Sequence, residues 1–255
     1  MSERRLEGRR CLVTGAAGGQ GAAVSRRFAA EGASLAVTDV GDERVQALAA
    51  ELRDGGATAV GVTADARDEA QVAGAMEVAV GALGGLDVLY NNAGVLLLDD
   101  DRPSEDLELD TWNQVLAINA TGMFLFCKHA LRPLLEAAPG SVILNVGSAA
   151  SYRGDPHFHA YAAAKGALLS YTASLAQCYG PQGLRANLIC PGFIETPMIE
   201  SLLSDEDLLA AVTGATALRR MGQPEEIAAY AAFLASTDAS FVTDAVVTVH
   251  GGFVK

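Results

Sequence analysis

The sequence predicts a doubly wound α/β fold, with about seven parallel strands and helices on both faces of the sheet. Short β-branched runs alternate along the chain with alanine- and leucine-rich segments of helical length. The runs LAVTD, SVILNV and AVVTV are continuously apolar, which is typical of parallel strands covered on both faces. With 255 residues, 50% of them apolar, the chain can bury a large core, and we expect a single domain over residues 1–255.

The expected elements follow one another in strict alternation. The strands are RCLVT (10–14), SLAVTD (34–39), TAVGVT (58–63), LDVLYN (86–91), SVILNV (141–146), RANLIC (185–190) and AVVTV (245–249). The helices lie between them, at 19–31, 42–53, 68–82, 110–136, 160–179 and 224–235. Nothing in the composition indicates a boundary to a second domain.

Two connections are longer than is usual in compact domains, near 94–110 and 191–223. Both follow the carboxyl end of an expected strand, which is the edge where open α/β sheets bind ligands. We therefore expect these loops to face the substrate.

Charge and composition exclude several classes of protein. Lys and Arg number 18 against 31 Asp and Glu, a formal net charge of −13, which disfavours binding to nucleic acid or to an anionic membrane. The charged N-terminus does not resemble a signal peptide, and no run of apolar residues is long enough to span a bilayer, so we expect a cytoplasmic protein. Cys11, Cys127, Cys178 and Cys190 have no metal-ligand spacing; we expect no metal site and small, buried, reduced thiols.

A glycine-rich turn follows the first expected strand. In TGAAGGQG (14–21), Gly15, Gly19 and Gly21 allow a tight turn and a close approach of the backbone to a pyrophosphate. The helix that follows directs its free N–H groups at the same anion. A strand before and a helix after are the context this pattern requires, so the sequence predicts a Rossmann-type dinucleotide site.

Asp39 ends the second expected strand, 18 residues beyond Gly21. A carboxylate there accepts hydrogen bonds from the ribose hydroxyls and repels a 2′-phosphate. No Arg or Lys lies in the glycine loop or directly after Asp39, the nearest being Arg44. The sequence therefore favours NAD(H) over NADP(H), the alternative being that Asp39 only caps a helix.

Tyr161 and Lys165 are four residues apart in an expected helix, so their side chains share one face. An ammonium beside a phenol stabilises the phenolate, and we expect the pKa of Tyr161 to be lowered. Ser148, 13 residues before Tyr161, ends the preceding strand and can hydrogen-bond a substrate oxygen. These groups can move a proton while a nicotinamide carries a hydride.

At this point the chain resembles the short-chain dehydrogenases/reductases, in their single-domain form, over nearly its whole length. The resemblance is carried in order by TGAAGGQG at 14–21, NNAG at 91–94, Asn119 within INATGMF, Ser148, YAAAK at 161–165 and PG at 191–192.

The resemblance implies a role for each matching residue. Tyr161 is the expected general acid/base, Lys165 lowers its pKa and binds the nicotinamide ribose, and Ser148 orients and polarises the substrate oxygen. Asn119 is expected to kink its helix and to hold a water that links Lys165 to solvent. The residues expected to contact the cofactor are Gly15, Gly19, Gln20, Gly21, Asp39, Asp65, Ala66, Asn92, Gly94, Tyr161, Lys165, Pro191, Gly192, Ile194 and Thr196.

Within that set, the resemblance implies that Asp65 binds the adenine amino group, with Ala66 beside it. Asn92 and Gly94 match the stretch that lines the adenosine ribose. Thr196 matches the threonine that holds the nicotinamide carboxamide, and Ile194 contributes backbone contacts.

Three positions depart from the family pattern. Gln20 stands where an Ile or Leu is usual, which changes the expected packing over the nicotinamide end. Asp244 and His250 stand where Gly and Asp are common, near the subunit contact.

Substrate contacts are expected from both sides of the site. His157 and His159 lie between Ser148 and Tyr161, and Phe193 and Met198 belong to an apolar segment that could close over the substrate or pack on the core. The acidic run in the 94–110 loop, including Asp99, Asp100 and Asp101, is interpreted as a solvated face that disfavours anionic substrates.

These observations favour an NAD(H)-dependent oxidoreductase that interconverts a secondary alcohol and a ketone on a small, mostly apolar molecule. The alternatives are an NADPH-dependent 3-oxoacyl-thioester ketoreductase and, in another class, a non-catalytic nucleotide-binding regulator. The resemblance also implies a homo-oligomer, either a tetramer or a dimer.

Overall fold

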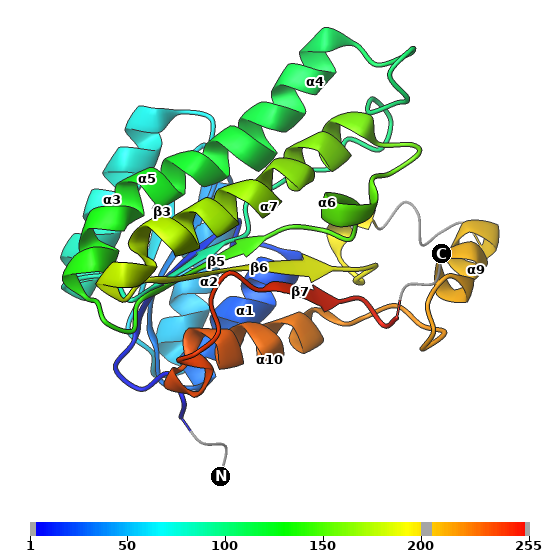
Figure 1. Cartoon of the computed structure of the whole chain (residues 1–255). Coiled ribbons are helices and arrows are strands. Elements are labelled where there is room, and N and C mark those ends of the chain that lie inside the picture. Colours follow the sequence, from blue (N-terminus) through cyan, green and yellow to red (C-terminus); the bar gives the residue numbers. More distant parts are fainter. Residues whose placement is uncertain (1–3, 200–205, 253–255) are drawn as a thin grey trace.

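A seven-stranded sheet with every neighbouring pair parallel lies at the centre of the molecule (Figure 1). The computed structural model describes residues 4–199 and 206–252, so part of the expected 191–223 loop lies outside the described residues. The strands are β1 (Arg10–Thr14), β2 (Ser34–Asp39), β3 (Ala59–Thr63), β4 (Val88–Asn91), β5 (Val142–Val146), β6 (Arg185–Pro191) and β7 (Val246–Val249). Their order across the sheet is β3-β2-β1-β4-β5-β6-β7: from β1 the chain adds β2 and β3 on one side, and from β4 onward it adds strands on the other side. That switch of sides, between β1 and β4, is where doubly wound sheets bind ligands.

Helices cover both faces of the sheet, which confirms the predicted fold class. One face carries α1 (Gly19–Ala30), α2 (Asp42–Asp54) and α10 (Pro224–Ala235), and the other carries α3 (Glu69–Leu83), α5 (Met123–Glu136) and α7 (His159–Tyr179). Each layer buries its own apolar cluster against the sheet, because strands covered on both faces bury side chains on both. The remaining helices are α4 (Leu109–Leu116), α6 (Ala150–Arg153) and α9 (Glu206–Gly214).

The predicted strands lie within two residues of the observed ones, and the expected helix 110–136 departs most. It is divided into α4 and α5 by a π-helical turn, Ala117–Gly122, which contains Asn119. A π-turn inserts extra backbone without altering the apolar pattern much, so the helical period alone does not reveal it. α9 lies inside a segment expected to be a loop.

Two expectations about burial are wrong. β7 is an edge strand with residues alternately exposed and half-buried, so its continuous apolar run does not mean cover on both faces. Cys178 is exposed near the end of α7, whereas the other three cysteines are buried. None of the helices in the described ranges is long and apolar enough to cross a membrane.

Asp244 adopts a left-handed backbone, with φ of 57°. Glycine adopts this conformation freely, and Asp is among the few other residues that tolerate it. Its N–H still donates to the carbonyl of Ala186 at 2.8 Å, which fixes the start of β7 beside β6. The departure at this position is therefore accommodated locally.

Candidate active site

The glycine loop between β1 and α1 packs tightly at two positions. Gly15 has φ of 60°, and a β-carbon there would lie 2.7 Å from Ala93 Cα. At Gly21 a β-carbon would overlap the carbonyl oxygen of Gly15. Asn92 fixes the loop from the end of β4, because its side-chain amide donates to the carbonyls of Thr14 and Gly15 at 3.2 and 3.0 Å. At Gly18, directly before α1, a β-carbon would meet nothing within 4 Å, so the backbone there is open to a pyrophosphate, whereas at Gly19 it would lie 3.1 Å from Thr196 Cγ2.

Two pockets lie along the carboxyl edge of the sheet and share Gly94. The first is lined on the β2 and β3 side by Thr38, Asp39, Asp65, Ala66 and Arg67, among others. The second contains most of the other predicted residues, namely Gln20, Asn92, Asn119, Ser148, Tyr161, Lys165, Pro191, Gly192, Ile194 and Thr196. A groove of this kind, on either side of the topological switch, has the layout of a dinucleotide site.

Unpaired polar atoms point to a ligand in both pockets. Within the described residues, Thr38 Oγ1 and Gln20 Oε1 are buried side-chain oxygens with no hydrogen-bond partner. Such atoms are costly to leave unsatisfied, and each belongs to a residue lining one of the pockets. The glycine cradle and these two oxygens fit a nicotinamide dinucleotide.

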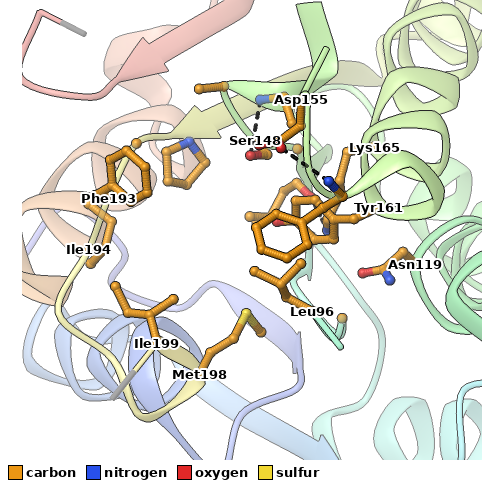
Figure 2. Close-up of a pocket in the computed structure, with 18 of the residues that line it drawn as sticks. Leu96, Asn119, Ser148, Asp155, Tyr161, Lys165, Phe193, Ile194, Met198 and Ile199 are labelled. Atoms are coloured by element: carbon orange, nitrogen blue, oxygen red, sulfur yellow. Dashed lines mark hydrogen bonds between the residues drawn. The ribbon is translucent and has the colours of Figure 1, made fainter. Parts of the chain in front are cut away.

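Tyr161 and Lys165 project from α7 into the second pocket, opposite an apolar wall formed by Phe193, Met198 and Ile199 (Figure 2). Lys165 is buried; its Nζ lies 5.7 Å from the centre of the Tyr161 ring and donates to the carbonyl of Val146 at 2.9 Å. The chain therefore brings a phenol, an ammonium and the Ser148 hydroxyl to one point at the end of β5.

A family model described as "Enoyl-(Acyl carrier protein) reductase" matches residues 15–254 of this chain. The chain belongs to the short-chain dehydrogenase/reductase family. The cis-4-hydroxycyclohexanecarboxylate dehydrogenase of Sinomonas cyclohexanicum is 38% identical over 242 residues, 95% of each chain. The 3-alpha-(or 20-beta)-hydroxysteroid dehydrogenase of Mycobacterium bovis is 40% identical over 98% of this chain and 91% of its own.

A solved structure agrees with this assignment. A short-chain dehydrogenase from Burkholderia cenocepacia J2315, in complex with NADP, superposes with a TM-score of 0.88 and 32% identity, over 97% of this chain and 98% of its own. Members of the short-chain dehydrogenase/reductase family use nicotinamide cofactors, and that neighbour holds the phosphorylated form.

In this member of the short-chain dehydrogenases/reductases, the expectation of a lowered tyrosine pKa is not met in the protein alone. Burial raises the pKa of Tyr161 to about 12, with the hydrogen bond from Ser148 opposing it and Asp155 adding to it. Burial also lowers the pKa of Lys165 to about 8. The loss of hydration raises the pKa of Tyr161 more than the nearby ammonium of Lys165 lowers it. Lys165 Nζ is bonded to a backbone carbonyl rather than to the phenol.

Asn119 joins the π-turn to the loop after β4. Its Nδ2 donates to the carbonyls of Val95 and Val115 at 2.9 and 3.1 Å, and its Oδ1 accepts from Val95 N–H at 3.1 Å. A β-carbon on Gly94 would lie 2.6 Å from Asn119 Oδ1 and 3.2 Å from Lys165 Nζ. Gly94 is therefore what lets the loop pass between these two side chains.

In the first pocket, the carboxylates of Asp39 and Asp65 already have hydrogen-bond partners within the protein. Asp39 accepts from the N–H groups of Ala17 and Gly41 at 3.0 and 3.2 Å, which ties the glycine loop to the end of β2. Arg67 pairs with Asp65 at 2.6 Å and holds the pKa of that carboxyl below its usual range.

The predicted substrate residues do not all reach the pocket. Phe193 and Met198 line it, together with Leu96 and Phe158. His157 is exposed and its ring meets that of Phe158, and His159 Nδ1 accepts from Ser104 N–H at 3.0 Å instead of facing the pocket. The polar groups at this end of the pocket come from Arg153 and Asp155, which sequence reasoning did not single out.

The interpretation of the acidic run as a solvated face is wrong for one residue. Asp99 and Asp100 are exposed, but Asp101 is 1% exposed. Its two carboxylate oxygens accept the N–H groups of Ala160 and Tyr161, at 3.0 and 2.8 Å. No local pattern distinguishes Asp101 from its neighbours, because its partners lie about sixty residues away.

Proposed function

We propose that this chain is an NAD(H)-dependent oxidoreductase that interconverts a secondary alcohol and a ketone on a small, mostly apolar molecule, with Tyr161 as general acid/base. The observation that carries the proposal is the meeting of Tyr161, Lys165 and Ser148 in one pocket that adjoins the glycine cradle and faces an apolar wall. The family relationship supports an oxidoreductase acting on CH–OH groups.

The side chains divide the proton handling between them. Ser148 would hydrogen-bond the substrate oxygen and hold it beside the Tyr161 hydroxyl, within proton-transfer distance. In oxidation the tyrosinate takes the alcohol proton, and in reduction the phenol returns it. Lys165 would stabilise the tyrosinate and bind the ribose of the cofactor. When bound, the nicotinamide supplies the hydride acceptor or donor.

Asp39 supports NAD(H). Among the charged residues that line the adenosine pocket, Arg67 is paired with Asp65, which leaves the Asp39 carboxylate as the uncompensated charge. A 2′-phosphate beside it would meet like charge, whereas two ribose hydroxyls can donate to it. The NADP-bound relative makes this the point that most needs a direct test.

Replacing Asp39 by Ala is expected to lower kcat/KM for NAD+ by about tenfold to a hundredfold, the worth of hydrogen bonds to a charged acceptor, and to raise it for NADP+. Asp39→Asn is the matched control, because it keeps an acceptor for the Ala17 N–H while removing the charge. Steady-state kinetics with both cofactors measure the ratio. A wild-type preference for NADP+, unchanged in Asp39→Ala, would overturn the cofactor assignment.

The rate of alcohol oxidation is expected to rise with pH between 7 and 10. Burial holds the pKa of Tyr161 at about 12 before cofactor binds, so the tyrosinate that acts as base is scarce at neutral pH. The fraction of tyrosinate increases with each pH unit. Ketone reduction needs the phenol, which stays protonated well below pH 12, so its rate is expected to be nearly flat over the same range. Initial rates in both directions test this, and an oxidation rate that is flat over this range contradicts it.

We propose an alicyclic alcohol as the substrate class. By their names, one relative reported above acts on a hydroxycyclohexane and the other on hydroxysteroids, so both act on molecules built on aliphatic rings. The pocket wall of Leu96, Phe193, Met198 and Ile199 suits an apolar ring. A spectrophotometric panel containing cyclohexanol, cis-4-hydroxycyclohexanecarboxylate and a 3α-hydroxysteroid, each with NAD+ and NADP+, tests the class. Turnover of a 3-oxoacyl thioester with NADPH, and of none of these alcohols, would favour the ketoreductase alternative.

A further inference from the structure

Asp101 is a buried acid placed at the start of the helix that carries the proposed acid/base. α7 begins at His159, and its N-cap residue, Phe158, has no side-chain oxygen to accept the free N–H groups of the first turn. Asp101 supplies that acceptor from a loop far along the chain, with one oxygen to Ala160 and the other to Tyr161. Its negative charge also faces the positive end of the helix dipole.

The backbone N–H of Tyr161 is thus held directly by Asp101, at 2.8 Å. Such charge-assisted bonds are stronger than bonds between neutral groups, and here they act at the residue whose phenol must meet the substrate. Lys165 lies one turn further along the same helix and is held separately, by its bond to the carbonyl of Val146, so loss of the Asp101 bonds acts first on Tyr161.

The loop that carries Asp101 contacts the site at its other end as well. Val95, six residues earlier, exchanges two hydrogen bonds with the Asn119 side chain, and Leu96 between them lines the substrate pocket (Figure 2). Asp101 is itself fixed by a turn, since its N–H donates to the carbonyl of Leu97 at 2.9 Å. One short segment therefore sets the spacing between the π-turn, the pocket wall and the start of α7.

A second contact joins the same loop to the same helix end. His159 Nδ1 accepts from the N–H of Ser104 at 3.0 Å and lies 2.9 Å from its hydroxyl oxygen. This contact is exposed and does not involve Tyr161, whereas the Asp101 contact is buried. The two contacts therefore provide an internal comparison.

We infer that Asp101 is a positioning residue for the reaction: by binding the first turn of α7 it holds Tyr161 at the distance from substrate that proton transfer requires. The inference rests on the proposed role of Tyr161. A displacement of about 1 Å in a reacting group can reduce a rate by about a hundredfold, which is the scale of effect expected here.

The test compares Asp101→Ala and Asp101→Asn with wild type, measuring kcat with cis-4-hydroxycyclohexanecarboxylate, or with the alcohol that reacts fastest in the panel, and the Kd of NADH by fluorescence. We expect Asp101→Ala to lower kcat about tenfold to a hundredfold and to leave the Kd within about twofold, because Asp101 does not line either pocket that would hold the cofactor. Asp101→Asn keeps one acceptor oxygen but places an amide NH2 against the other N–H, so it is expected to lower kcat by about threefold to tenfold, less than Asp101→Ala.

Asp100→Ala and Ser104→Ala are the matched controls. Asp100 is an exposed acid in the same run, and Ser104 retains its backbone N–H donor to His159 after substitution, so both variants are expected to keep the wild-type kcat.

A kcat within twofold of wild type in folded Asp101→Ala would overturn the inference and leave Asp101 as a structural cap. If that variant fails to fold, Asp101→Asn decides: a kcat reduced threefold or more at an unchanged Kd supports the inference, and a smaller reduction overturns it. Tyr161→Phe separates the two proposals, because full activity in that variant defeats the proposed function itself, whereas an inactive Tyr161→Phe beside a fully active Asp101→Ala defeats only the positioning role.

Discussion

Tyr161→Phe is expected to reduce kcat by about a thousandfold in both directions, within the range that a positioned general acid/base contributes. The substitution removes one oxygen and keeps the ring, whose centre lies 5.7 Å from Lys165 Nζ, so the packing of α7 is preserved. The hydroxyl exchanges a hydrogen bond with Ser148, and that serine remains able to bind the substrate oxygen. Rates measured with a saturating alcohol and cofactor give the size of the loss.

Tyr152→Phe is the control for this substitution, because Tyr152 precedes the same helix but is 41% exposed and does not line the pocket. NADH binding should remain within about twofold of wild type in both variants, since neither loses a charge. A Tyr161→Phe enzyme with undiminished kcat would remove the basis for Tyr161 as acid/base. Binding of NADH without turnover of any substrate by the wild type would instead favour the non-catalytic nucleotide-binding regulator.

The fold could be predicted because its information is local. Continuous apolar runs place β1, β2, β5 and β6 within a residue of their observed bounds, and the strict alternation of strands and helices predicts that the strands are parallel. The prediction of burial failed for β7, where the position of the strand in the sheet decides which side chains are covered. β7 has the same composition as a central strand, but it lies at the sheet edge, and only the topology reveals that.

The candidate site divides in the same way. Motif spacing was enough to predict that Ser148, Tyr161 and Lys165 would share a pocket. It could not predict that burial raises the pKa of Tyr161, because hydration depends on the assembled walls rather than on the nearest charge. It also could not separate Asp101 from Asp99 and Asp100, because the helix end that buries Asp101 is contributed by distant sequence. The homo-oligomeric state stays a prediction.

Lys165→Met is expected to make the protein more stable at pH 7 and nearly inactive. Burial lowers the pKa of Lys165 from 10.5 to about 8, so holding its ammonium in the fold costs about 3 kcal/mol at neutral pH. Met keeps most of the apolar stem and removes the charge, but it leaves the carbonyl of Val146 without its donor, at a cost of about 1 kcal/mol. The net gain of about 2 kcal/mol corresponds to a rise in Tm of roughly 4–8 °C.

The sign of the effect with pH makes the prediction specific. The folded-state pKa is depressed, so the penalty of Lys165 is complete below about pH 8 and absent above the unfolded value of 10.5. In denaturant unfolding, the free energy of unfolding of Lys165→Met should therefore exceed that of wild type at pH 7 and no longer exceed it at pH 10.5. Lys128→Met is the matched control: Lys128 is half-exposed and paired with Glu69, so its removal should bring no gain at either pH.

Activity and stability should move in opposite directions in Lys165→Met. Removing the ammonium from beside the phenol is expected to lower kcat by about a hundredfold to a thousandfold, the usual loss when one charge-stabilising donor is deleted from an active site. A less stable Lys165→Met at pH 7 would mean that the bond to Val146 outweighs the cost of burial. An apolar residue of similar size would stabilise the fold, yet the chain retains the buried lysine. Selection for the reaction rather than for stability would produce this outcome.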